Sequence, residues 1–101
     1  MPSFPLKLEN TYWSKGFFNV TVDHQQWVTE SEGPFQLFLG DASEATEGRV
    51  SRSANRNATP RIYGNKALAT FFQAHYKPGQ SVHVEILSPT SMRLGDATSH
   101  G

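Results

Sequence analysis

The sequence predicts a small, mainly β domain of the barrel or sandwich class with two short helices. Short runs of alternating apolar and polar residues recur along the chain, and turn residues separate them at short intervals. This spacing is typical of small barrels and sandwiches, whereas parallel α/β folds need long crossover segments. The chain has 101 residues, close to the commonest size of one domain, and 37% of them are hydrophobic, enough for a core.

The expected strands are the alternating runs, each bounded by Gly, Pro or other turn residues. In chain order they are residues 5–9, 17–23, 35–40, 49–53, 59–63, 80–87 and 91–94. The fourth and fifth form the legs of a hairpin with its tip at residues 54–58. Residues 10–16 are expected to form a loop or strand tip, 41–48 an acidic loop, and 96–101 a tail. The single domain 1–101 would then have its core at about residues 5–95.

Two segments carry helix signals. Asp23 resembles a cap for a short helix over residues 24–29, which would fold Trp27 and Val28 back onto the core. Asn65 can cap a second helix, which ends at the turn of residues 77–79. The apolar stripe of this second helix consists of Leu68, Phe71, Phe72 and Tyr76.

Catalytic and metal-binding patterns are missing from the sequence. It has no Cys, its four His residues have no ligand spacing, and it has neither a glycine-rich phosphate loop nor a nucleophile elbow. We therefore expect no catalysis by this chain alone, no metal and no cofactor. No apolar run could span a bilayer and no signal-peptide core is present, so we expect no membrane partner and a cytoplasmic location.

Charge is distributed unevenly along the chain, although the formal net charge is zero. Residues 16–48 contain six acids and no Lys or Arg, whereas residues 48–84 contain six bases and no acid. A chain of this kind can fold with one basic face that binds a polyanion. If the two halves interleave in space, the field averages out instead.

Residues 49–63 are the most basic stretch. They include four arginines, two asparagines, two serines and a threonine, with no acid. Arginine forks suit phosphate or guanine, amides suit adenine, and small hydroxyls suit phosphate, so the stretch indicates a DNA-contacting arm. The alternative is a polar, solvated hairpin tip.

Taken in order, these pieces resemble the B3-type DNA-binding pseudobarrel, which occurs in plant transcription factors and in some bacterial restriction endonucleases. Residues 12–20 (YWSKGFFNV) and 52–62 (RSANRNATPRI) look closest to the bacterial branch. The resemblance covers about residues 6–95 and implies an open seven-stranded β pseudobarrel with two short α-helices. It also implies a bacterial target-recognition domain, with any cleavage left to a fused or partner nuclease domain.

The resemblance further implies that two arms enter the major groove of double-stranded DNA. The first arm would consist of Asn10, Thr11, Tyr12, Trp13, Ser14 and Lys15. The second would present Arg49, Arg52, Ser53, Asn55, Arg56, Asn57, Thr59 and Arg61. Base-reading arginines would set specificity, whereas Lys15 would grip phosphate on any sequence.

Other functions fit the same sequence. A carbohydrate- or peptide-binding β module could use Tyr12, Trp13 and Tyr63 as a stacking platform, and its binding would not depend on salt. The DNA-binding domain of a transcription regulator is another alternative. A catalytic domain with an unrecognised site ranks last.

Overall fold

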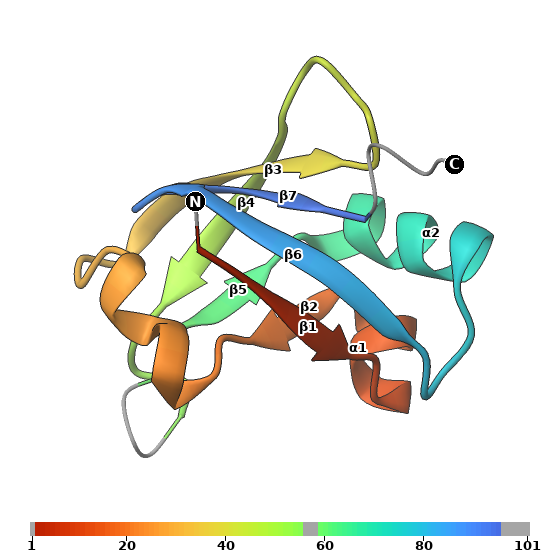
Figure 1. Cartoon of the computed structure of the whole chain (residues 1–101), viewed down its shortest axis with the longest axis horizontal. Helices are drawn as coiled ribbons and strands as arrows, with labels where there is room; N and C mark the ends of the chain where they lie inside the picture. Colours follow the sequence, from red (N-terminus) through yellow and green to blue (C-terminus); the bar gives the residue numbers. More distant parts are fainter. Residues whose placement is uncertain (1, 56–58, 96–101) are drawn as a thin grey trace.

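A single mixed sheet of seven strands, curled into a half-barrel, forms the body of the molecule (Figure 1). The computed structural model describes residues 2–55 and 59–95. The strands are β1 (Ser3–Lys7), β2 (Phe17–Asn19), β3 (Gly33–Leu39), β4 (Thr46–Ser51), β5 (Arg61–Tyr63), β6 (Ser81–Ser88) and β7 (Ser91–Leu94). Their order is β1-β6-β7-β3-β4-β5-β2, and every neighbouring pair is antiparallel except β3 with β7. The mainly β, open pseudobarrel class predicted from the sequence is confirmed.

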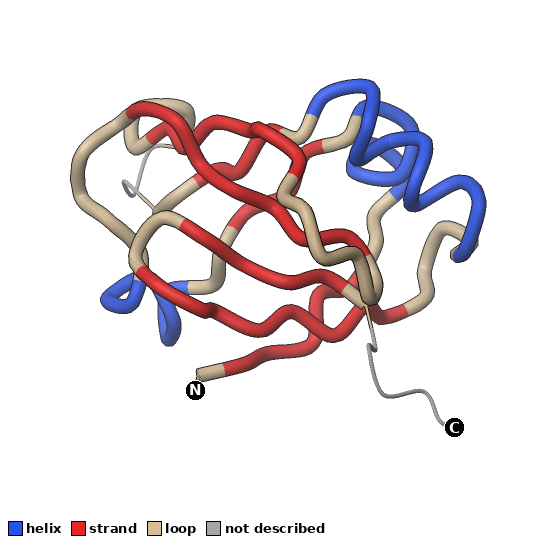
Figure 2. Tube along the Cα trace, turned by 90° about the horizontal axis from the view of Figure 1, so that it is seen from above, coloured by secondary structure: helices blue, strands red, loops and turns tan. Residues whose placement is uncertain are grey.

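Three short helices cover the two ends of the half-barrel in the described ranges. They are α1 (Asn10–Lys15), the 3-10 helix η1 (Val22–Trp27) and α2 (Asn65–His75). Figures 1 and 2 show α1 and α2 together at one end and η1 at the other. None of these helices is both long and apolar enough to cross a membrane.

The prediction of a loop or strand tip at residues 10–16 is wrong, because this segment forms α1. A helix of six residues is too short to be stable by itself, so packing must hold it. Trp13 holds the helix in place. Its ring packs against the core, and its Nε1 donates to the carbonyl of Tyr76 at 3.0 Å. Gly16, in the left-handed conformation with φ of 77°, ends the helix.

The first predicted helix also differs from the observed one. It is a 3-10 helix that begins at Val22, and Thr21 rather than Asp23 occupies its N-cap position. Val28 is buried as expected, with 3% of its surface exposed, but Trp27 is 46% exposed and does not join the core. Trp27 instead lines a shallow surface groove that includes Pro89.

The second predicted helix is present as α2, although Gly64 rather than Asn65 occupies its N-cap position. The amide nitrogens of Gly64 and Asn65 both donate to the carbonyl of Gly16. The end of α1 and the start of α2 are thereby fixed to each other. The helix packs its apolar stripe onto the core, where Leu68 and Phe72 are fully buried.

Strand alternation fills the interior of the half-barrel with apolar side chains. The fully buried positions include Phe18 on β2, Ile62 on β5 and Val50 on β4. The neighbours of these residues along each strand must therefore point outward. This alternation places the outward side chains of β2, β5 and β4 on one surface of the sheet.

Candidate nucleic-acid interface

The outward face of β2, β5 and β4 gathers aromatic, amide and cationic side chains. Phe17 pairs with Tyr63 and Tyr63 with Arg49 in the strand register. Two residues further along the strands, Asn19 pairs with Arg61 and Arg61 with Ser51. Side chains directly opposite each other on one face of a sheet lie close enough to interact. We call this surface the β5 face, defined by Phe17, Asn19, Arg49, Ser51, Arg61 and Tyr63.

Arg61 lies at the centre of the β5 face and is held in place by neutral partners. Its Nε donates to Oδ1 of Asn19 and its Nη2 to Oδ1 of Asn55, both at 3.0 Å. Its guanidinium carbon also lies 4.7 Å from the centroid of the Phe17 ring. Within residues 2–55 and 59–95 no carboxylate forms an ion pair with it, so its positive charge is not neutralised locally.

Asn55 acts as a brace for Arg61. Its Nδ2 donates to Oδ1 of Asn19 at 3.0 Å and to the carbonyl and hydroxyl oxygens of Thr59 at 3.1 and 3.3 Å. Both ends of its amide are therefore engaged inside the protein. Thr59 is also buried, with 5% of its surface exposed. Asn55 and Thr59 were both predicted as DNA contacts of the second arm. In the free protein their polar groups are engaged internally and help to position Arg61.

The aromatic side chains form a continuous strip that reaches into α1. Tyr12 meets Phe17 edge-on with the ring centroids 5.4 Å apart, and Phe17 lies 5.9 Å from Tyr63. Burial and the nearby charge of Glu9 raise the pKa of Tyr12, while Asn19 and Arg61 act in the opposite direction. The Tyr12 hydroxyl therefore lies beside the polar centre of the β5 face.

The remaining residues of the first predicted arm do not join this surface. Trp13 docks on the end of α2, where its own carbonyl also accepts from Nε2 of Gln73. The other four residues, all exposed on α1, are Asn10, Thr11, Ser14 and Lys15.

Most of the described residues of the two predicted arms lie at opposite ends of β2 and β5. Because β2 and β5 are antiparallel, the start of β2 pairs with the end of β5. The helix α1 precedes Phe17 at that end, whereas the β4–β5 connection leaves from the end where Asn19 meets Arg61 (Figure 1). Among the described residues, Tyr12 links the two segments through Asn19 and Arg61.

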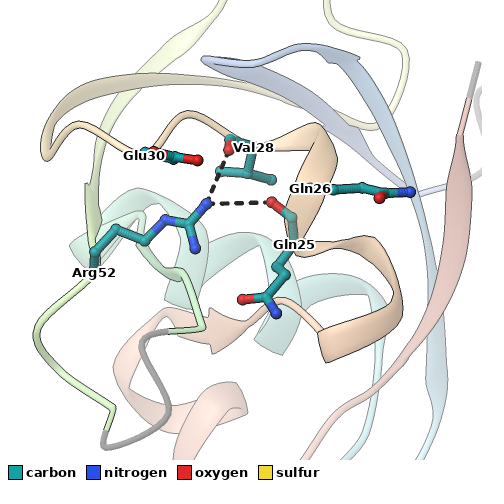
Figure 3. A pocket seen from close by; sticks show the side chains of 5 residues that line it. All are labelled: Gln25, Gln26, Val28, Glu30 and Arg52. Carbon is teal, nitrogen blue, oxygen red and sulfur yellow. Dashed lines mark hydrogen bonds between the residues drawn. The ribbon is translucent and has the colours of Figure 1, made fainter.

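Arg52 points away from the β5 face and joins the β4–β5 connection to η1 (Figure 3). Its Nη2 donates to the carbonyls of Val28 and Gln25 at 2.9 and 3.2 Å, and its Nε donates to the carbonyl of Thr29 at 3.0 Å. The side chain lines a cavity of about 400 Å³ together with Gln25, Gln26, Val28 and Glu30. A cation beside the carbonyls at a helix end is stabilising, so Arg52 has a structural role that its sequence context did not reveal.

Arg49 is the exposed cation of the β5 face. In the part of the chain that the structure describes, no hydrogen bond or ion pair fixes its guanidinium. It lines a surface groove of about 300 Å³ with Pro34, Glu47, Gly48 and Asn65. Of the other predicted contacts, Ser53 binds Glu32 through its amide and hydroxyl groups. Arg56 and Asn57 lie outside the described residues.

Sequence reasoning missed Phe17 and Asn19 as members of the site. Their outward orientation follows from the buried Phe18 between them, so alternation could have identified both. Their partners on the β5 face and in the β4–β5 connection come from 36 to 46 positions further along the chain, which a single sequence does not show. No metal-binding group of three or more His, Asp or Glu residues occurs in the described ranges.

Comparison with known proteins identifies no relative: no protein-family model matches the chain, and neither a curated protein nor a solved structure resembles it significantly.

Proposed function

We propose that this chain binds double-stranded DNA sequence-specifically through the β5 face. The supporting observation is the setting of Arg61. Two neutral amides and an aromatic ring hold its guanidinium in one orientation, and no carboxylate in the described ranges competes for it.

Such a setting suits recognition of a guanine edge or a phosphate. A guanidinium offers planar, paired donors, and also stacks on aromatic rings. Fixing it before binding reduces the side-chain entropy lost in the complex. Arg49 on the same face and the exposed Lys15 on α1 would add phosphate contacts that depend less on sequence.

The resemblance to the B3-type pseudobarrel refines this proposal. The domain would be the target-recognition part of a bacterial, cytoplasmic restriction endonuclease, with cleavage supplied by a fused or partner nuclease domain. A transcription-regulator domain would use the same surface. The curled sheet with helices at both ends is compatible with either assignment.

A carbohydrate- or peptide-binding role is the second candidate, because Tyr12, Phe17 and Tyr63 form an aromatic strip. Stacking on such a strip is insensitive to salt, whereas binding through phosphate contacts weakens steeply as salt rises. Salt dependence therefore separates the two candidates.

The test is a fluorescence anisotropy titration of a labelled duplex pool at about 50 and 200 mM salt. The proteins compared are the wild type, Arg61→Ala and, as a matched control, Lys77→Ala, in which the lost cation lies beyond α2. We expect steep salt dependence, and Arg61→Ala should weaken binding by about 5- to 150-fold, corresponding to about 1–3 kcal/mol. Salt-insensitive binding, or equal effects of both substitutions, would contradict the proposal. Sequencing the bound fraction would then reveal the preferred site.

A further inference from the structure

Four donors at the end of β4 and the start of the β4–β5 connection converge on one oxygen atom. Oε2 of Glu32 accepts from the backbone amides of Arg52 and Ser53 at 2.6 and 2.8 Å. It also accepts from the hydroxyls of Ser53 and Ser51 at 2.9 and 3.2 Å. Successive backbone amides that point at a single anion form an anion-binding nest. We call this group of donors, from residues 51–53, the nest.

The present occupant of the nest is an exposed side chain from a different part of the chain. Glu32 lies between η1 and β3, 20 positions before Arg52. The bonds from the Ser53 hydroxyl and from the Arg52 and Ser53 amides lower the pKa of this carboxyl. All four donors are neutral groups that would donate equally well to a phosphate oxygen.

The nest has support that does not depend on Glu32. The Arg52 side chain holds the connection from the other side through the carbonyls of Val28 and Thr29. Ser51 is also the last residue of β4 and pairs with Arg61. The donors should therefore keep their arrangement when the carboxylate leaves.

We propose that the nest is a binding site for one phosphate group, and that Glu32 occupies it in the free protein as an internal competitor. This inference builds on the proposed function, because the nest adjoins the β5 face through the Ser51–Arg61 pair. A backbone phosphate of the bound duplex would replace the carboxylate. Glu32 would thus weaken binding to any phosphate that does not offer enough further contacts to displace it.

Titration with inorganic phosphate, followed by the backbone amide NMR signals of Arg52 and Ser53, tests the nest without nucleic acid. The proteins are the wild type, Glu32→Ala, Glu32→Gln and the matched control Glu30→Ala, which removes a neighbouring exposed acid. We expect saturable shifts at both amides in Glu32→Ala, with phosphate binding at least about tenfold tighter than in the wild type and in Glu30→Ala. In those two proteins the Glu32 carboxylate still competes for the nest, and a charged acceptor binds such donors more strongly than a neutral one.

Glu32→Gln controls for a change in the conformation of the β4–β5 connection, because it keeps a neutral acceptor of the same shape. It should bind phosphate more tightly than the wild type. Phosphate affinity equal to that of the wild type in this variant would overturn the proposal, as would unshifted Arg52 and Ser53 amides in a folded Glu32→Ala protein.

A duplex titration of the same proteins and of Glu30→Gln separates this inference from the proposed function. Glu32→Gln should bind duplex more tightly than Glu30→Gln, which controls for the loss of one negative charge. Phosphate binding at the nest without duplex binding by any variant would refute the proposed function and leave the anion site standing. Duplex binding without the phosphate shifts would refute the anion site alone.

Discussion

Replacing Arg52 by Ala should destabilise the fold rather than affect only ligand binding. The guanidinium donates to three backbone carbonyls, those of Gln25, Val28 and Thr29, at 2.9 to 3.2 Å. A hydrogen bond with a charged partner contributes about 1.5–3 kcal/mol. Two of the three bonds share one nitrogen and the group is only partly buried, so we count two bonds and discount for solvent. The expected loss is about 2–4 kcal/mol.

Urea unfolding followed by tryptophan fluorescence measures this loss. With a slope of about 2 kcal/mol/M, the midpoint of Arg52→Ala should fall by roughly 1–2 M. Arg49→Ala is the matched control, because this arginine is exposed and should change stability by no more than about 0.5 kcal/mol. Arg52→Lys keeps the charge without the fork and should lie between them. Equal midpoints for the wild type and Arg52→Ala would refute the structural role.

Three further predictions concern stability. Gly16→Ala should cost at least about 2 kcal/mol in thermal unfolding, since a Cβ there would lie 2.8 Å from the amide nitrogen of Ala69. Gly79→Ala, also at positive φ but with nothing within 4 Å, should cost only about 1 kcal/mol. Equal losses would contradict the contact. Trp13→Phe should lose about 1 kcal/mol in urea, because the ring packing remains while the bond to Tyr76 is lost; no change would mean that this bond does not stabilise the docking of α1. Because the pKa of Glu32 is lowered in the folded protein, its stabilising contribution should be complete above the ordinary glutamate value of about 4.3 and fade as pH falls through the folded value. The stability difference between the wild type and Glu32→Gln should therefore shrink on acidification from pH 6, and a constant difference would exclude this linkage.

The strands could be predicted from the sequence because burial imposes a strict alternation on them. Phe18, Val50 and Ile62 can be identified as core residues from the alternation with their neighbours alone, and each is fully buried. The helix α1 could not be predicted from the sequence, since its stability depends on a hydrogen bond between residues 63 positions apart. Its six residues lack a side-chain cap and have no apolar stripe of their own.

The candidate site was only partly predictable for a similar reason. Composition identified Arg52 and Arg61 as equivalent members of one basic stretch. Folding gives them opposite tasks, because Arg52 meets backbone carbonyls of the η1 region whereas Arg61 meets the side chains of Asn19 and Phe17. These partners come from distant parts of the chain and are set by the strand register, not by local sequence.

The most direct test of DNA binding through the β5 face is an NMR titration of the isotopically labelled protein with an unlabelled duplex selected from the random pool. We predict that the largest shifts occur at the Arg61 Nε–H group, at the side-chain amides of Asn19 and Asn55, and at the backbone of Tyr63. Largest shifts in the groove around Trp27 and Pro89 instead, or no shifts at saturating duplex, would contradict the account.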